Sequence, residues 1–215
     1  MRKLLIWAVL AALITAYGLI QNAPATVAAV ATPSPLIVID PGHGGWDPGA
    51  VRGAVYEKSL TLAIALKLGT LLQRKNFRVY YTRTQDSALS STVLRDLNAR
   101  AHLANRLGAT VFVSIHVNTE PTGTMAGPLV YYNRMSPVSY ALAQSISAAL
   151  VPLTSTARSP RPIRQWILHV ATMPAVNVEV GFLSHRLDQS RMQSPAYQEQ
   201  LSRAIAVGIT RYLHR

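Results

Sequence analysis

The sequence predicts a single α/β domain, with a sheet of about six strands and helices on both faces. Short runs rich in β-branched and aromatic residues alternate with stretches whose apolar residues recur at helical spacing. With 49% hydrophobic residues, the chain is too apolar to be disordered. It contains no cysteine, which excludes disulfide scaffolds, thiolate zinc fingers and cysteine nucleophiles.

The first 31 residues have the pattern of an export signal. Arg2 and Lys3 precede an uncharged, mostly apolar run over residues 4–20, and mainly small residues follow. Because Ala-Val-Ala at 29–31 suits a signal peptidase, we expect residues 1–31 to be a signal peptide and residues 32–215 to be the functional domain. The alternative is a retained N-terminal anchor, since the apolar run lies at the short limit of a membrane span of about 20 residues. In both cases the domain is expected to be exported, to the periplasm, the cell wall or the extracellular space.

The first half of the domain is expected to alternate strands and helices. A strand at 36–40 is followed by a helix over 57–72, whose leucines fall on one face. A strand at 78–82, a helix over 91–107 and a strand at 111–116 follow; both strands are short and rich in β-branched or aromatic residues.

The second half adds three strands and two helices. A strand at 129–132 precedes a helix over 138–150. Two further strands are expected at 165–170 and 175–180. A final helix over 195–213 opens on a proline, which suits the first turn of a helix.

Polar residues gather where the predicted strands end, which is where open α/β sheets place their ligand crevice. His43 lies three residues past the first strand, His116 closes the third, and Glu179 is near the end of the strand at 175–180. Glu57 begins the helix that follows the His43 loop. Since the chain has only nine acidic residues, two glutamates at these positions indicate a functional role rather than ordinary solvent-exposed side chains.

Two imidazoles and one carboxylate are enough to hold a catalytic zinc, which keeps its fourth tetrahedral position for water. One glutamate is then left to act as general base on that water, while the metal polarises the carbonyl under attack. The residues alone leave open which glutamate has which role. The glycines around His43 allow its loop to approach the metal closely.

The remaining histidines are weaker candidates, because a histidine is often a satisfied structural group. His102 falls in a predicted helix, His169 in a predicted strand and His214 at the C-terminus, so none of them is expected to be a ligand. His185 follows the Glu179 strand closely and is placed to contact substrate.

Three motifs surround the candidate residues: IDPGHGG at 39–45 with DPGA at 47–50, SIHVN at 114–118, and MPAV at 173–176 running into EVGFLS at 179–184. Through these motifs the chain resembles the zinc-dependent N-acetylmuramoyl-L-alanine amidases of the third amidase family. The resemblance implies a twisted, mostly parallel sheet. It also implies hydrolysis of the amide bond between N-acetylmuramic acid and L-alanine in peptidoglycan.

The resemblance assigns the roles that the residues alone leave open. His43, Glu57 and His116 match the family's zinc ligands, and Glu179 matches its catalytic glutamate. The chain departs from the family at 159–164, where relatives carry an Asn-Arg-Gly type of loop, and at positions 110 and 185, where an aspartate and an asparagine are usual. These departures lie outside the metal set and concern substrate fit.

Two other classes of function are compatible with the same residues. One is a peptidoglycan-binding protein that has lost catalysis, and the intact set of two histidines and two glutamates counts against it. The other is a different zinc hydrolase, a peptidase or a deacetylase, acting on the same polymer. The bond that is cut would separate these classes.

The net charge of +12 favours an anionic partner. Arginines at 158, 161 and 164 could grip the carboxylates or phosphates of anionic wall polymers, although a solvated basic face is the alternative interpretation. Export argues against nucleic acid as a partner. Membrane contact is expected only if the N-terminal segment is retained.

One spacing bears on regulation. Some members of the family cover their zinc with a helical segment inserted after the strand that matches 129–132, and an activator removes it. Here only residues 133–137 separate that strand from the next helix, too few for a covering helix at about 3.6 residues per turn. The sequence therefore predicts an open site.

Overall fold

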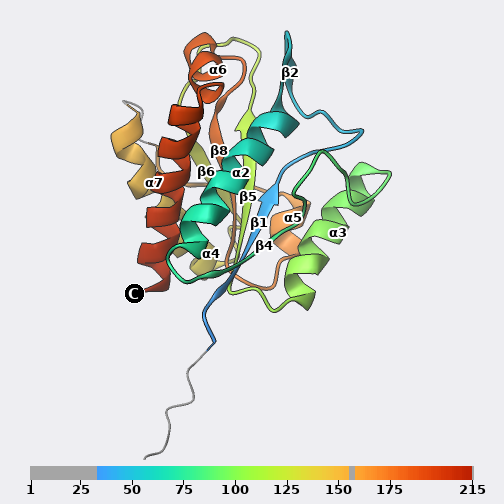
Figure 1. Ribbon diagram of the computed structural model, residues 1–215, viewed down its shortest axis with the longest axis vertical. Coiled ribbons are helices and arrows are strands. Elements are labelled where there is room, and N and C mark those ends of the chain that lie inside the picture. Colours follow the sequence, from blue (N-terminus) through green and yellow to red (C-terminus); the bar gives the residue numbers. More distant parts are fainter. Residues whose placement is uncertain (1–32, 155–157, 215) are drawn as a thin grey trace, which may run out of the picture. The chain divides into compact units, whose positions relative to one another are not determined.

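The computed structural model describes residues 33–154 and 158–214 (Figure 1). The predicted signal peptide or anchor at residues 1–31 lies outside the described residues. Ser34–Arg215 form one compact unit. Across the part of the chain that the structure describes, we find no helix with the length and apolar character needed to cross a membrane.

Six strands form the main sheet, in the order β4-β1-β5-β8-β6-β7. Strands β4, β1, β5 and β8 run parallel to one another, β6 runs antiparallel to β8, and β7 runs parallel to β6. The mostly parallel α/β fold is therefore confirmed. The strands are β1 (Leu36–Pro41), β4 (Arg78–Tyr81), β5 (Val111–Asn118), β6 (Leu129–Tyr132), β7 (Arg161–Pro162) and β8 (Ala175–Phe182).

Helices cover both faces of the sheet, as the sequence predicts. On one face lie α2 (Glu57–Gln73), α4 (Pro137–Leu150) and α7 (Pro195–Leu213), with α2 and α7 side by side (Figure 1). On the other face lie α3 (Val93–Arg106) and α5 (Trp166–Val170). Each face buries its own apolar cluster, so the sheet is the middle of three layers.

The alternation of side chains along β8 sets the position of the site. Val176, Val178 and Val180 belong to the cluster under α2, α4 and α7. Because successive residues of a strand face opposite sides of the sheet, Asn177 and Glu179 lie on the face of α3 and α5. Two polar side chains are therefore buried on that face.

The prediction of a strand at 165–170 is wrong, because residues 166–170 form helix α5. Ile167 and Leu168 are buried next to each other, while Trp166 and His169, three residues apart, are exposed. This is a helical pattern, which strand alternation cannot produce. The place beside β6 is taken by the two-residue strand β7, so His169 is on a helix rather than in a strand.

Four short strands and helices that the sequence does not predict complete the domain. A hairpin of two short strands precedes α2, a single 3₁₀ turn follows α4, and a short helix follows β8. They are β2 (Val51–Arg52), β3 (Val55–Tyr56), η1 (Val151–Leu153) and α6 (Arg186–Met192).

Candidate active site

The glycine-rich loop after β1 brings His43 against the neighbouring elements. A Cβ at Gly42 would lie 2.3 Å from the His116 ring, so only glycine leaves room for that side chain. Gly49 has φ +65°, and a Cβ there would lie 2.6 Å from Glu57 Oε2. These two glycines let the loop close around the side chains of the cluster.

A buried ion pair beneath this loop holds it in place. Asp40 accepts hydrogen bonds from the hydroxyls of Thr82 (2.5 Å) and Ser114 (2.7 Å), and pairs with Arg100 at 2.8 Å. Burial raises the pKa of Asp40, but Arg100 and the two hydroxyls lower it further than burial raises it. The Arg100 guanidinium also donates to the carbonyl oxygen of His43 at 2.7 Å. The conformation of the His43 loop is thus tied to a fully satisfied charge network.

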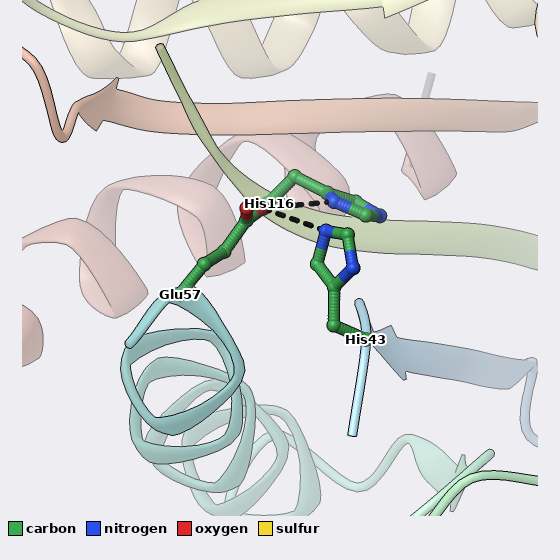
Figure 2. A group of neighbouring side chains, drawn as sticks. All are labelled: His43, Glu57 and His116. Carbon is green, nitrogen blue, oxygen red and sulfur yellow. Dashed lines mark hydrogen bonds and ion pairs between the residues drawn. The ribbon is translucent and has the colours of Figure 1, made fainter. Parts of the chain in front are cut away.

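Figure 2 shows His43, Glu57 and His116 pointing toward one another from the loop after β1, the first turn of α2 and β5. Glu57 Oε1 lies 3.1 Å from His43 Nε2 and 3.0 Å from His116 Nδ1. One ligand atom from each residue can be chosen so that all three lie within 4.8 Å of one another. The structure therefore brings together the three residues predicted to bind metal.

Further contacts fix the orientation of two of these side chains. His43 Nδ1 lies 2.7 Å from Asp47 Oδ2, which turns Nε2 toward Glu57. Glu57 accepts backbone N–H bonds from Ala50 at 2.8 Å and from Val117 at 2.9 Å. Outer partners of this kind orient metal ligands and tune their basicity. Asp47 has no predicted role, although its position four residues after His43 in the same loop is a signal for such a contact.

The electrostatics of the cluster favour positive charge beside Glu57. Burial lowers the pKa of His43, but the hydrogen bonds and charges of Glu57 and Asp47 outweigh it and raise that pKa to about 9. Burial raises the pKa of Glu57, yet its hydrogen bonds to His116 and His43 hold that pKa well below its ordinary value. Protonated His43 thus places positive charge beside Glu57, where a bound cation would supply the same charge.

Glu179 stands beside this cluster on the adjacent strand, in register with His116. It is 7% exposed, and its Oε1 accepts a hydrogen bond from Asn177 Nδ2 at 3.0 Å. Its Oε2 is buried without a hydrogen-bond partner among the described residues. Burial raises the pKa of Glu179 to about 7, against the lowering effect of His116 and the Asn177 amide. A carboxyl with such a pKa can both accept and donate a proton near neutral pH.

The other histidines have separate surroundings. His185 caps the N-terminus of α6, because its Nδ1 accepts the backbone N–H of Asp188 at 3.3 Å. His102 is exposed on α3, His169 is exposed on α5, and the ring of His214 packs near Phe77. Within residues 33–154 and 158–214, the metal-binding cluster includes none of them.

Comparison with known proteins agrees with this architecture. A family model described as N-acetylmuramoyl-L-alanine amidase matches residues 37–211. The germination-specific N-acetylmuramoyl-L-alanine amidase of Bacillus subtilis (strain 168) is 33% identical over 187 residues, covering 82% of this chain and 79% of that protein.

Solved structures give the same result. The N-acetylmuramoyl-L-alanine amidase from Clostridium difficile 630 is 34% identical with a TM-score of 0.79, covering 85% of this chain and 98% of that one. The catalytic domain of CwlV, an N-acetylmuramoyl-L-alanine amidase from Bacillus (Paenibacillus) polymyxa var. colistinus, is 36% identical with a TM-score of 0.77, covering 84% and 98%. With its family model, its relatives and its fold in agreement, the chain belongs to the N-acetylmuramoyl-L-alanine amidase family.

Proposed function

We propose that this protein is a zinc-dependent N-acetylmuramoyl-L-alanine amidase in which His43, Glu57 and His116 hold the metal and Glu179 is the general base. Family membership gives the enzyme class, hydrolysis of the amide between N-acetylmuramic acid and L-alanine in peptidoglycan. The observation that carries the residue assignment is the convergence of the three donors beside a buried carboxylate with an unpartnered oxygen.

The donor set fits zinc. Two imidazole nitrogens and one carboxylate oxygen are the ligand types of catalytic zinc sites, which keep one position open. The contact between Asp47 and His43 is the carboxylate–histidine arrangement that supports such ligands. When bound, zinc supplies a Lewis acid that polarises the amide carbonyl and lowers the pKa of water.

Glu179 performs the proton transfers of the reaction. Its carboxylate takes a proton from the attacking water as the new C–O bond forms at the lactyl carbonyl. It then gives a proton to the L-alanine nitrogen as the C–N bond breaks, which releases a free amine and a lactyl carboxylate. Both transfers suit a buried carboxyl whose pKa is raised to about 7.

Export completes the proposal. We infer that residues 1–31 direct the protein out of the cytoplasm, so that residues 32–215 work on the wall in the periplasm or outside the cell. A relative from Staphylococcus epidermidis is named a probable cell wall amidase, which supports this location. N-terminal sequencing of the protein recovered from its host distinguishes a cleaved signal from a retained anchor.

Purified protein comprising residues 32–215, loaded with zinc, is expected to cleave peptidoglycan without a helper protein. Only residues 133–136 separate β6 from α4, so no covering helix is inserted there. Released ends are identified after digestion of purified peptidoglycan, and new L-alanine amino termini are expected. New termini within the stem peptide, or free amino sugars, would identify a peptidase or a deacetylase instead. Strict dependence on an added activator would contradict the open site.

The basic residues are arranged differently from the predicted arginine cluster. Arg164 lines a groove of about 560 Å³ together with Arg134 and the exposed Trp166, whereas Arg158 lines a separate hollow with Arg211. Neither Arg134 nor Arg164 has an acidic partner in the described part of the chain. We infer that this groove, the Arg134–Arg164 groove, contacts carboxylates or phosphates of the wall.

Charge reversal of Arg134 and Arg164 to glutamate is expected to weaken sedimentation with wall fragments. The loss should be largest at low salt, because exposed charges are screened beyond about 10 Å at 0.1 M and about 3 Å at 1 M. The matched control reverses Arg158 and Arg211, which changes the net charge equally in the other hollow. Equal losses for the two pairs would indicate a non-specific basic surface. Unchanged sedimentation would show that the groove arginines do not contact the wall.

A further inference from the structure

Asn177 and Glu179 are the two buried polar residues of the otherwise apolar strand β8. Asn177 is 2% exposed and lies between Val176 and Val178. Burying an amide without full hydrogen bonding costs free energy, and its Oδ1 has no partner among the described residues. A valine or leucine would fill this position without that cost, so the amide calls for a functional explanation.

The contacts of Asn177 supply one. Its Nδ2 donates to Glu179 Oε1 at 3.0 Å and to Gln165 Oε1 at 3.2 Å. Asn177 and Glu179 are two residues apart on one strand, so their side chains share a face. Gln165 immediately precedes α5 and is half-buried. The Asn177 amide thus lies between the proposed base and a second amide from another element.

The chemistry of the three groups fixes their orientation. An ionised carboxylate only accepts hydrogen bonds, so Asn177 must present its NH₂ group to Glu179. Gln165 presents its oxygen to the same NH₂ group. If Asn177 turned its own oxygen toward Glu179, two acceptors would face each other. The Glu179 carboxylate therefore sets the orientation of Asn177, and Gln165 supports that orientation by accepting from the same NH₂ group.

The same contact distinguishes the two oxygens of Glu179. Oε1 is held by Asn177, whereas Oε2 is buried and has no partner in the described residues. A carboxylate anchored through one oxygen keeps the other in a fixed place, and the hydrogen-bonding capacity of that other oxygen is unused in the described residues. Losing the anchor would let the group rotate and would reduce the fraction of molecules in the productive geometry.

We propose that Asn177, supported by its hydrogen bond to Gln165, is a positioning residue that fixes the Glu179 carboxylate with Oε2 as the proton-accepting oxygen. The inference rests on the proposed role of Glu179 as general base. Among the described residues, Asn177 makes no hydrogen bond to the three metal-binding side chains, and it is buried. It is therefore expected to affect turnover and to leave metal content and substrate affinity unchanged.

The first test replaces Asn177 by leucine, which has a similar volume and no donor. Loss of a hydrogen bond to a charged group is expected to lower kcat about 10- to 100-fold. KM and zinc content should stay at their wild-type values, and the thermal unfolding midpoint should be unchanged or higher. An unchanged kcat, or a rise in KM at constant kcat, would overturn the inference.

The Gln165 variants provide a test outside the strand. Gln165→Glu retains an acceptor oxygen for Asn177 Nδ2, whereas Gln165→Leu removes it. Gln165→Leu should lower kcat and Gln165→Glu should retain more of it. This comparison decides the question even if Asn177→Leu folds poorly, and equal activity of the two variants would contradict the supporting role of Gln165.

A double-mutant cycle separates this inference from the proposed function. If Asn177 acts through Glu179, adding Asn177→Leu to Glu179→Gln lowers the residual activity no further. The same fold-loss in both backgrounds would show that Asn177 acts independently of the base, and would overturn the inference. Failure of the proposed function would give a different result: either the wild-type protein would be inactive, or the Glu179→Gln single variant would be fully active.

Discussion

His116→Ala is expected to lose most of its bound zinc and, with it, amide hydrolysis. A catalytic zinc with three protein ligands has no redundancy, so removing one imidazole leaves two donors and a much weaker site. The same outcome is expected for His43→Ala. The measurement is zinc per protein chain on samples dialysed against a weak chelator, with hydrolysis of purified peptidoglycan assayed on the same samples.

A matched histidine substitution controls this experiment. His185→Ala removes a helix cap outside the cluster and should keep stoichiometric zinc. Far-UV circular dichroism of each variant tests whether zinc was lost through unfolding, because His116 also fills the space that Gly42 leaves open for its ring. Stoichiometric zinc in a folded His116→Ala variant would remove His116 from the ligand set.

The position of the candidate site could be predicted because it depends on topology. His116 and Glu179 lie near the carboxyl ends of two strands whose sequences are short apolar runs. Neighbouring parallel strands bring their carboxyl ends to the same edge of the sheet. Glu57 begins α2, as the spacing of the leucines predicts. No knowledge of side-chain packing is needed for these placements.

The parts that sequence reasoning missed depend on tertiary contacts. Asp47 and Asn177 matter through which neighbour they reach, and nothing in the local pattern names that neighbour. Residues 166–170 have enough apolar residues to suggest a strand, yet packing against α3 selects a helix.

The three arginines that are close in sequence do not all line one hollow, for a related reason. Arg158, Arg161 and Arg164 are close in sequence, but the segment between them includes the extended strand β7. In extended chain each residue advances about 3.3 Å, so residues three apart separate by about 10 Å. Arg158 and Arg164 accordingly line different surface hollows.

Glu179→Gln is expected to keep its fold and its zinc while losing most of its turnover. Glutamine has the same shape as glutamate, and its oxygen can still accept the Asn177 hydrogen bond that Oε1 accepts now. It cannot take a proton from water, and a general base contributes about 10² to 10⁴ in rate. A loss of kcat in that range at unchanged zinc content is therefore the expected result.

The measurement that decides the role of Glu179 is zinc content and hydrolysis on one sample. If Glu179→Gln loses its zinc, Glu179 is a ligand, and Glu57 becomes the doubtful member of the set. A carboxylate in the first turn of a helix is stabilised there by the helix dipole alone, which would then account for Glu57. Against that outcome stands the geometry, because Glu57 Oε1 lies within 3.1 Å of both imidazoles while Glu179 Oε1 is bound to Asn177. We therefore propose Glu57, which contacts both imidazoles, as the ligand and Glu179, which is anchored beside them, as the base.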